Sequence, residues 1–359
     1  NFTHEGTVSD LVRAYGEYGR FLKHCLYEFS GDAVREFFAG YGVDGKVEKG
    51  GCVFPVSDKA GSIKKVLLDA AAESGLKFFY GRRVEVVERR GDVFFVTAGD
   101  IEIDCRAVII STGGKSWPGL GSTGDGYAIA KAFGHTIVEP RAALVGLVVE
   151  DDWVRGLQGV AVGDVQVWAK IGGKKVSERG PLMFTDKGVG GPSVFNFSRF
   201  VVGQLKGGLD VYLDLLPAMS EDDLRKFIID AATESPKKGV VSFVSGLLPK
   251  RLAEAILERV GVSGDVCLGQ FGKKSRSKLV EMIKRLRLKV MEAGGFAEAT
   301  ITRGGVRREE IDSKTMESKI CPGLYFAGEV IDADGPCGGY NLQIAWSTGM
   351  LAGLSAVKK

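Results

Sequence analysis

Two glycine-rich stretches carry the residues that could do chemistry. Residues 108–114, VIISTGG, are an apolar run that ends in small residues, and residues 323–349 lead from the apolar GLYFAG through Glu329 into a second glycine loop. Small residues at a strand end let a ligand approach the backbone, and ligands of open α/β sheets lie beyond the carboxyl ends of the strands. The two stretches predict either such a site or turns with purely structural glycines.

A helix after the second loop would complete the site. The loop GPCGG leads into residues 340–353, and a helix would begin near Tyr340 to Leu342. The unpaired N–H groups and the positive dipole end of this helix would favour negative charge, and Glu329 could accept hydrogen bonds from sugar-like hydroxyls. A reduced flavin is anionic at the carbonyl edge of its ring, so the pattern suits a flavin.

Residues before the second glycine loop predict further elements. Apolar spacing predicts a helix over 60–74 that is capped by Gly75, and residues 121–135 read as a glycine loop that leads into a helix. The cap of that second helix is expected among Ser122, Thr123 and Asp125. Short strands of a small antiparallel sheet are predicted at 76–80, 84–88, 93–97 and 101–105, with a turn at 89–92.

The order of the strand-like and helix-like segments along the chain predicts one discontinuous α/β domain with an insertion. The apolar strands that end in the two glycine loops have the pattern of strands buried on both faces of a parallel sheet, and ITRGGV at 301–306 also reads as a strand. Between them lie short β-like runs and then amphipathic helices, the last at 275–293. The expected parts are an α/β domain (1–140 and 300–359), a β-barrel-like domain (141–217 with 293–299) and a helical subdomain (218–292).

Composition excludes several classes of protein. The net charge of +3 is too small to indicate a nucleic-acid partner by itself, and the basic run 273–289 reads as a solvated helix face. No apolar run is long enough to cross a membrane. Six scattered cysteines fit free thiols in a reducing cytoplasm, and with only three histidines no metal site is expected.

The motifs together resemble a known family. VIISTGG and GLYFAGEV look like the two strand-end signatures of flavoproteins with two dinucleotide-binding domains, and the wider pattern resembles the NAD(P)/FAD-dependent oxidoreductases that include aminoacetone-oxidase-like flavoproteins. The resemblance implies a Rossmann-like FAD-binding domain whose first βαβ unit, with its phosphate loop, precedes Asn1. It spans nearly the whole chain and is carried by residues 51–60, 112–137, 139–147, 183–193, 302–306 and 311–353.

The resemblance also implies which residues hold FAD. The amino-terminal residues would lie near the pyrophosphate or flavin, one backbone would meet the adenine, and the strand ends would follow the ribityl chain. The loop and the start of the last helix would approach the isoalloxazine ring. The expected cofactor-binding residues are Asn1, Thr3, Val84, Thr112, Gly113, Gly114, Gly328, Glu329, Asp334, Gly338, Gly339, Tyr340, Asn341, Leu342 and Gln343.

Three other side chains are candidates for chemistry. Cys337 lies in the loop expected near the flavin, but it has no neighbouring cysteine in sequence, so a spacer role is favoured. Arg303 and Arg307 flank a glycine pair and are read as solvated arginines at a turn, with orientation of an acidic or carbonyl substrate as the alternative. The sequence does not identify a catalytic acid or base.

The expected activity is therefore FAD-dependent hydride transfer to or from a small organic substrate of the enone or amine class. NAD(P)H is the candidate electron donor, and the inserted domains would choose the substrate. Two alternatives remain open. One is a flavoprotein that acts in tRNA modification, which would need residues 273–289 to form a continuous basic face, and the other is a flavin-binding redox sensor without turnover.

Overall fold

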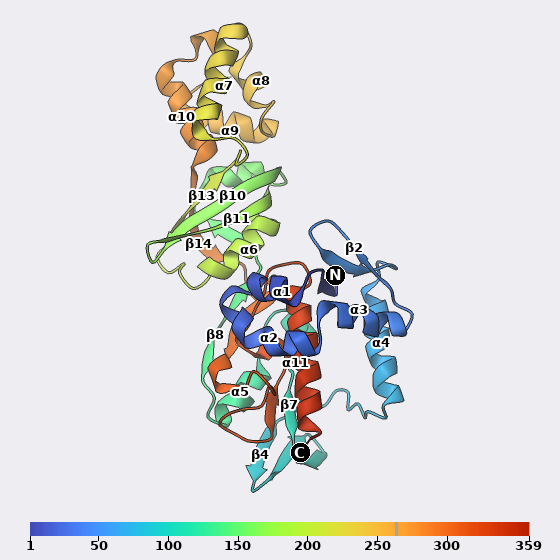
Figure 1. Cartoon of the computed structure of the whole chain (residues 1–359). Helices are drawn as coiled ribbons and strands as arrows, with labels where there is room; N and C mark the ends of the chain where they lie inside the picture. Colours follow the sequence, from blue (N-terminus) through green and yellow to red (C-terminus); the bar gives the residue numbers. More distant parts are fainter. Residues whose placement is uncertain (263–264, 359) are drawn as a thin grey trace. The chain divides into compact units, whose positions relative to one another are not determined.

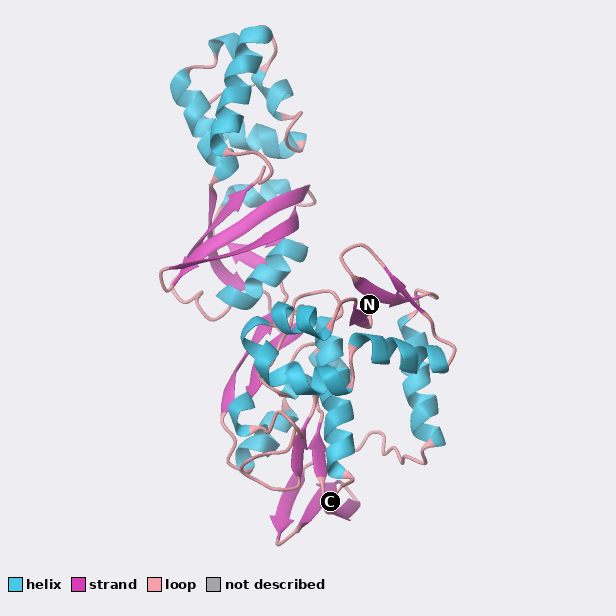
Figure 2. Ribbon diagram, in the orientation of Figure 1, coloured by secondary structure: helices cyan, strands magenta, loops and turns pink. Residues whose placement is uncertain are grey.

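A computed structural model describes residues 1–262 and 265–358, and the chain divides into two compact units. Unit 1 comprises residues 1–141 and 301–359, and unit 2 comprises residues 142–300. The structure is mixed α/β, with a closed six-stranded barrel and a group of helices in unit 2 (Figure 2). The predicted combination of α/β, barrel and helical parts is confirmed.

Two parallel strands form the centre of unit 1. β7 (Val108–Ile110) pairs with β16 (Leu324–Phe326), so the two glycine-ended stretches run side by side although more than two hundred residues separate them (Figure 1). β16 is buried on both faces, as predicted. For β7 the same prediction is wrong, because Ile109 is 38% exposed and lines a cavity instead of packing against another element.

Helices and a small sheet surround this pair of strands. α11 (Tyr340–Ala356) packs against both strands and against α2 (Gly19–Glu28). A three-stranded antiparallel sheet has the order β1-β3-β2. The other amino-terminal elements are β1 (Thr3–His4), α1 (Val8–Ala14), η1 (Gly16–Tyr18), α3 (Gly31–Gly40), β2 (Gly45–Val47), β3 (Cys52–Pro55) and α4 (Ala60–Glu73).

The predicted small antiparallel sheet is present, but it has three strands instead of the four expected. β4 (Val86–Arg90), β5 (Val93–Ala98) and β6 (Ile101–Cys105) pair in that order. The strand predicted at 76–80 is wrong: these residues are irregular, because no neighbouring strand pairs with them and the exposed rings of Phe78 and Tyr80 stack on each other. The helix expected over 60–74 is confirmed, and Gly75 follows it with a φ of +73°.

The helix after the first glycine loop begins without a side-chain cap. α5 spans Asp125–Ala132, and its N-cap is Gly124, with a φ of +86°. The predicted capping role of Ser122, Thr123 or Asp125 is wrong, since the Asp125 carboxylate accepts hydrogen bonds from Arg83 and Thr123 instead. The remaining elements of unit 1 are η2 (Pro118–Leu120), β8 (Ile137–Ala143), β15 (Ile301–Val306), η5 (Arg308–Glu310) and η6 (Gly328–Val330).

Unit 2 contains a closed barrel (Figure 1). The helices within residues 221–284 gather at one end of the barrel, whereas the helix of residues 192–201 packs on the barrel strands. The strand order is β10-β11-β12-β9-β14-β13, and a single hydrophobic core joins the barrel to the helices. The elements are β9 (Leu147–Val149), η3 (Asp152–Leu157), β10 (Ala161–Ile171), β11 (Lys174–Phe184), β12 (Gly188–Gly190), α6 (Pro192–Val201), β13 (Leu209–Asp214), α7 (Glu221–Glu234), α8 (Val240–Val244), α9 (Lys250–Val260), η4 (Leu268–Gln270), α10 (Lys273–Lys284) and β14 (Leu286–Ala293).

The helix predicted over 275–293 is wrong in its second half. α10 ends at Lys284, and the barrel strand β14 begins at Leu286. From that point Leu286, Leu288 and Val290 alternate with Arg287 and Lys289, and the three apolar residues are fully buried. This period of two, rather than the leucine content, decides the structure because it places one face of a strand in the barrel core.

Candidate functional site

The amino terminus of α11 is open and free of side-chain caps. α11 begins at Tyr340, as predicted, and no described side chain caps it. The two residues before it, Gly338 and Gly339, have φ values of +119° and +98°, which L side chains rarely adopt. The first N–H groups of the helix are therefore left to bind something other than a cap, and their dipole favours negative charge.

Strand β1 fixes the position of this helix start. A Cβ on Gly339 would lie 2.1 Å from the carbonyl oxygen of Thr3, so only glycine permits the contact. The Thr3 hydroxyl donates to the amide oxygen of Gln343, and Gln343 donates to the Phe29 carbonyl across 3.0 Å. Thr3 and Gln343, both predicted cofactor ligands, thus lie at the site, but their side chains bind each other.

The loop before α11 is shaped by a side chain of the helix itself. Asn341 accepts a hydrogen bond from Gly335 N–H at 2.8 Å and donates to the carbonyls of Gly335 and Pro336. This contact uses the Asn341 side chain, so only its backbone N–H is offered at the helix start. The side chain of Leu342 is 42% exposed. Asn1, which comes shortly before β1 in the chain, is also exposed.

The ends of the two parallel strands meet at Thr302, a residue that the sequence reasoning missed. Its hydroxyl oxygen accepts hydrogen bonds from the N–H groups of Lys115 and Ser116, and its own N–H donates to Glu329 at 3.0 Å. A Cβ on Gly114 would lie 2.3 Å from this hydroxyl and 2.4 Å from the Glu329 carboxylate. Burial raises the pKa of Glu329. The only signal for Thr302 in the sequence is a small hydroxyl residue inside the predicted strand ITRGGV.

Gly328 and Gly113 complete this strand-end region. Gly328 has a φ of +73°, and its N–H donates to the hydroxyl of Thr348 on α11. A Cβ on Gly113 would come within 3.2 Å of the Ser122 hydroxyl. Gly328 is therefore required by its backbone conformation, whereas Gly113 is required by its φ of +72° and by the nearby Ser122 hydroxyl.

A cavity of about 620 Å³ opens beside β7 in unit 1. It brings together Val84 and Thr112, which the sequence predicted to lie along the cofactor, and it also contains Ile109. At its edge Arg83 donates two hydrogen bonds to Asp125, at 2.8 and 2.6 Å. The cavity has mostly apolar walls, and its volume suits one half of a dinucleotide.

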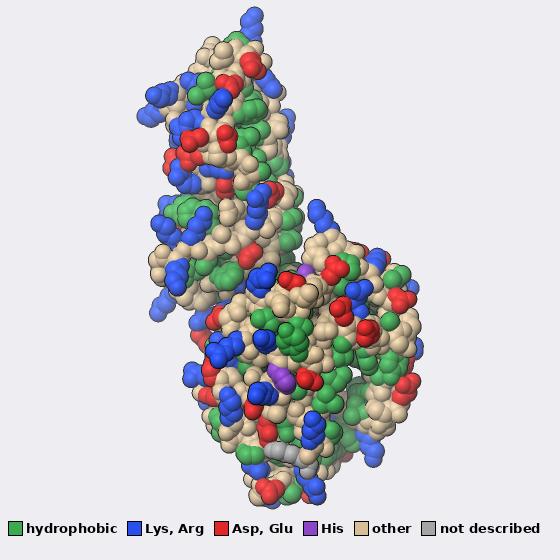
Figure 3. All heavy atoms as spheres, viewed as in Figure 1, with side chains coloured by type: hydrophobic (Ala, Val, Ile, Leu, Met, Phe, Trp, Pro, Cys, Tyr) green, Lys and Arg blue, Asp and Glu red, His purple; other side chains and the backbone are tan. Residues whose placement is uncertain are grey.

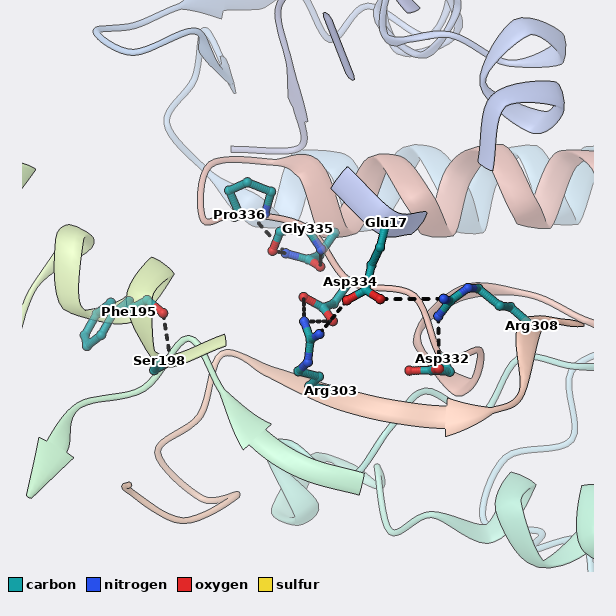
Figure 4. A network of polar contacts seen from close by, with 10 residues as sticks. Glu17, Phe195, Ser198, Arg303, Arg308, Asp332, Asp334, Gly335 and Pro336 are labelled. Atoms are coloured by element: carbon teal, nitrogen blue, oxygen red, sulfur yellow. Dashed lines mark hydrogen bonds and ion pairs between the residues drawn. The ribbon is translucent and has the colours of Figure 1, made fainter. Parts of the chain in front are cut away.

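A network of charged groups holds the loop that follows β16 (Figure 4). Arg303 forms ion pairs with Asp334 and Glu17 at 3.0 and 2.9 Å, and Arg308 lies 3.2 Å from Asp332. Both guanidinium groups also lie over the ring of Tyr18. Burial raises the pKa of Asp332 to about 6, although the two arginines oppose the shift.

This network corrects the interpretation of Arg303. The glycine pair after it lies inside β15 and not at a turn, and the Arg303 side chain is 24% exposed and paired on two sides. It is therefore not a solvated arginine. Arg307, by contrast, is exposed, as predicted. Asp334, expected to approach the flavin, turns its side chain toward Arg303.

Titratable groups also surround Gly338. Nδ1 of His4 lies 2.8 Å from the carbonyl oxygen of Gly338. The His4 ring stacks on the Tyr340 ring, with the two centroids 4.1 Å apart. Partial burial raises the pKa of the Cys337 thiol, which therefore stays protonated near neutrality. A Cβ on Gly338 would lie 3.0 Å from the sulfur of Cys52, so a second cysteine adjoins this loop.

Two further observations concern the residues that the structure describes. Within residues 1–262 and 265–358, no group of three or more His, Cys, Asp and Glu side chains could hold a metal ion. In the same ranges, no helix is both long and apolar enough to cross a membrane.

The residues of unit 1 fit FAD. The uncapped start of α11 suits an anionic ring, and the cavity beside Val84 suits the adenosine half. The glycines at 113–114, 328 and 338–339 place no side chain in this region. Of the predicted ligands, the structure gathers Asn1, Thr3, Asp334 and residues 338–343 around the helix start. Val84 and Thr112 lie apart in the cavity, and Gly113, Gly114, Gly328 and Glu329 lie at the strand ends.

Comparison with known proteins agrees with this geometry. The chain matches the family described as "HI0933-like protein Rossmann domain" over residues 1–355. It is 33% identical to a 3-dehydro-bile acid delta(4,6)-reductase of Clostridium scindens, over 100% of this chain and 88% of that protein. It is also similar to ribosomal RNA dihydrouridine synthases, with 34% identity for the Escherichia coli protein (81% of this chain, 70% of that one) and 32% for the Haemophilus influenzae protein (93% and 82%).

These matches confirm the Rossmann-type fold and the oxidoreductase class, while the narrower aminoacetone-oxidase-like assignment stays a prediction. The chain belongs to the HI0933-like family of Rossmann-domain, FAD-binding proteins within the flavoprotein superfamily.

Proposed function

We propose that this protein uses FAD to add hydrogen across a carbon–carbon double bond that is conjugated to a carbonyl group of a small organic molecule. The observation that carries the flavin is the uncapped start of α11, which is preceded by Gly338 and Gly339. The names of the relatives support the reaction. A delta(4,6)-reductase of a 3-dehydro compound and a dihydrouridine synthase both name the reduction of such a double bond.

The chain offers each part of FAD a matching surface. The cavity with Val84 and Thr112 would take the adenosine half, with Asn1 and Thr3 toward the pyrophosphate. Gly114, Gly328 and Glu329 would follow the ribityl chain, since the Glu329 carboxylate accepts hydrogen bonds and the glycines leave room. When bound, FAD supplies the hydride chemistry.

The residues around α11 would stabilise charge and fix geometry. The backbone N–H groups of Tyr340, Asn341 and Leu342 point from an uncapped helix start, and such groups stabilise negative charge where water is excluded. Arg303 would keep the preceding loop in place through Asp334, which holds the helix start in register with the strand ends. NADH or NADPH is the proposed electron donor.

A uridine of ribosomal RNA is a second candidate substrate, because two similar proteins carry that activity in their names. The basic run that the sequence offered for RNA does not form one face. It is divided between α10 and β14, and Lys284 is buried 2.7 Å from Asp214. Figure 3 shows acidic side chains interspersed with the basic ones on the visible side of unit 2. RNA binding would therefore need another surface.

The flavin claim has a direct test. The purified full-length protein is mixed with FAD, and its visible spectrum is recorded after gel filtration. Flavin bands that comigrate with the protein are expected. If these bands are absent after FAD has been added to folded protein, the proposal that the protein binds FAD is refuted.

The reaction is tested on the reduced protein without oxygen. The flavin is reduced with NADH or NADPH, and its reoxidation is followed after addition of steroid-like and cyclic enones, amines, or ribosomal RNA, with products identified by mass spectrometry. Reoxidation by an enone, with two hydrogens added to it, is expected. Reoxidation by rRNA alone would select the second candidate. The tRNA-modification alternative predicts a mobility shift with tRNA at low salt, and a redox sensor predicts no steady NAD(P)H oxidation with any acceptor.

A further inference from the structure

The outer face of the barrel carries aromatic and basic side chains next to each other. Strands β11, β10, β13 and β14 lie side by side in unit 2 (Figure 1). Val167 of β10 and Val211 of β13 are fully buried in the barrel core. Their neighbours Trp168 and Tyr212 therefore point to the outer side, because side chains alternate along a strand. Both are only partly buried, so ring surface is left for a partner.

The two rings form a row across the sheet. Trp168 and Tyr212 lie directly opposite each other, and their rings stack with the centroids 4.4 Å apart. Arg287 of β14, which lies opposite Tyr212, is next in the row. Trp168 covers one face of the Tyr212 ring, and among the residues that the structure describes no second ring and no cation lies over the other face. A planar base has room to stack there.

Three lysines gather beside this row, at the end of the β10–β11 hairpin. Lys170 and Lys175 lie directly opposite each other, and Lys174 precedes Lys175. Like charges in such a cross-strand pair repel each other, and none of these three exposed lysines has an ion-pair partner among the described residues. The Lys175 ammonium lies 4.8 Å from the centroid of the Trp168 ring. An anion bound at the hairpin end would relieve the repulsion next to the stacked rings.

The carboxylates on or beside this face are matched by other cations. Four ion pairs account for them: Asp164 with Arg179, Asp210 with Arg287, Asp214 with Lys284, and Glu150 with Lys289. The charge of the three hairpin lysines is therefore not compensated locally. The face is positive although the whole chain has a net charge of only +3.

The row continues into a cavity of about 540 Å³. Arg287 and Lys289 line this cavity together with Trp153 and Arg259, and the Arg259 guanidinium carbon lies 4.3 Å from the centroid of the Trp153 ring. The other lining residues are Glu150, Asp151, Glu281, Met282, Arg285 and Leu286. Three carboxylates thus face four cations, so the cavity is less positive than the hairpin end, but it adds a second pair of a cation and an aromatic ring.

We propose that this outer face of the barrel binds single-stranded RNA. A base stacks on the open face of Tyr212, the three hairpin lysines contact phosphates, and the strand continues past Arg287 toward the Trp153–Arg259 pair. Single strands are held in this way, by stacking on rings and by cations along the backbone, whereas the paired bases of a duplex do not reach such rings. The choice of RNA over DNA rests on the second candidate substrate of the proposed function, but the surface itself does not.

A matched pair of triple substitutions tests the charge. Lys170→Gln/Lys174→Gln/Lys175→Gln removes the hairpin lysines, and the control Lys273→Gln/Lys274→Gln/Lys278→Gln removes three exposed lysines of α10 in the same unit. Binding of a fluorescein-labelled oligouridine to the full-length protein with FAD is followed by anisotropy over a range of salt concentrations. The hairpin variant is expected to bind about tenfold more weakly, and its slope of log K against log salt should be smaller by about 2, because each phosphate contact on a single strand contributes about 0.7. The control is expected to match the wild type.

Substitution in the aromatic row gives a second, independent measurement. Tyr212→Leu removes the ring but keeps an apolar side chain on β13, and it should weaken binding of the oligouridine about tenfold with an unchanged salt slope. Tyr212→Phe keeps the ring and should bind like the wild type. The hairpin lysines are exposed, so their variant remains informative if Tyr212→Leu fails to fold.

The outcomes separate this surface from the proposed function. If both test variants lose oligouridine binding as expected but rRNA never reoxidises the reduced flavin, the surface stands and rRNA falls as a substrate. If rRNA at a limiting concentration is reduced by the hairpin variant as fast as by the wild type, the function stands and the surface is overturned. No binding of the oligouridine, equal binding of an annealed duplex, tighter binding of an oligothymidine, equally effective competition by polyglutamate, or an equal loss in the α10 control would each overturn the inference as well.

Discussion

Arg303 and Asp334 form a buried ion pair that joins strand β15 to the loop before α11. The guanidinium Nη1 lies 3.0 Å from the Asp334 carboxylate, whose side chain is 2% exposed. Glu17 contacts the same arginine, so residues from three separated segments meet at one point. The loop that leads into the open helix start is thereby held by charge as well as by the Asn341 side chain.

Removing this arginine should destabilise unit 1 and loosen the flavin. Arg303→Gln removes the guanidinium that lies 3.0 Å from the buried Asp334 carboxylate, and removing one member of a buried ion pair costs about 3 kcal/mol of unfolding free energy. Urea unfolding and FAD titration measure both effects. Arg307→Gln is the control, because Arg307 is exposed four residues along the same segment. Equal behaviour of the two variants would show that the pair does not hold the loop.

The glycine that precedes α11 and a glycine inside that helix should respond oppositely to alanine. A Cβ on Gly339 would collide with the Thr3 carbonyl at a φ of +98°, so Gly339→Ala should cost at least about 3 kcal/mol and reduce FAD binding. A Cβ on Gly349, inside the helix, meets nothing within 4 Å, so Gly349→Ala should stabilise by about 0.5–1 kcal/mol. Thermal unfolding of both variants checks the signs. A stable Gly339→Ala protein would contradict the packing of β1 on the helix start.

The buried amide of Gln343 should matter for stability more than for chemistry. Gln343→Leu leaves two buried hydroxyls, of Thr3 and Ser347, and the Phe29 carbonyl without this partner. A loss of about 2 kcal/mol in urea unfolding is expected. Leu354 lies on the same helix and is 45% exposed. Leu354→Ala should therefore change the free energy of unfolding by less than about 0.5 kcal/mol.

The cavity beside β7 should be sensitive to negative charge. Val84→Glu places a carboxylate in the cavity, where it would repel the phosphates of a dinucleotide and weaken FAD retention about tenfold or more. Val86→Glu puts the same charge on an exposed strand residue two positions away, outside that lining, and should retain FAD. Flavin absorbance after gel filtration distinguishes them. Full retention by Val84→Glu would remove the adenosine half from this cavity.

His135 should make the protein less stable in mild acid. Burial lowers the pKa of this imidazole below 6.5, despite Glu310 at 3.2 Å. Below pH 6.5 the unfolded chain binds a proton that the folded chain resists, so stability is present above that pH and is lost as the pH falls. Relative to His135→Gln, the wild type should lose on the order of 1 kcal/mol between about pH 7.5 and about pH 5.5. Urea unfolding at both pH values measures the difference, and parallel curves would contradict the assignment.

The sequence predicted the elements whose signal is local. The start of α11 follows from the Gly338–Gly339 pair before an apolar run, and β16 follows from an unbroken apolar strand. Residues 76–80 have the composition of a strand but no pairing partner, and the alternation of β14 was missed because it directly follows the helical pattern of α10. Pairing partners lie far away in the chain, so a strand's own residues do not show whether a partner is present.

The sequence by itself determined where the backbone must carry no side chain. The glycines of residues 113–114, 328 and 338–339 mark the site, because only glycine readily adopts their conformations or tolerates their contacts. Only the tertiary structure decided which side chains complete it. Thr302 links the two strand ends, and Arg303 turned from a surface residue into the partner of Asp334. Those roles arise from contacts between segments distant in sequence, which a local pattern does not encode.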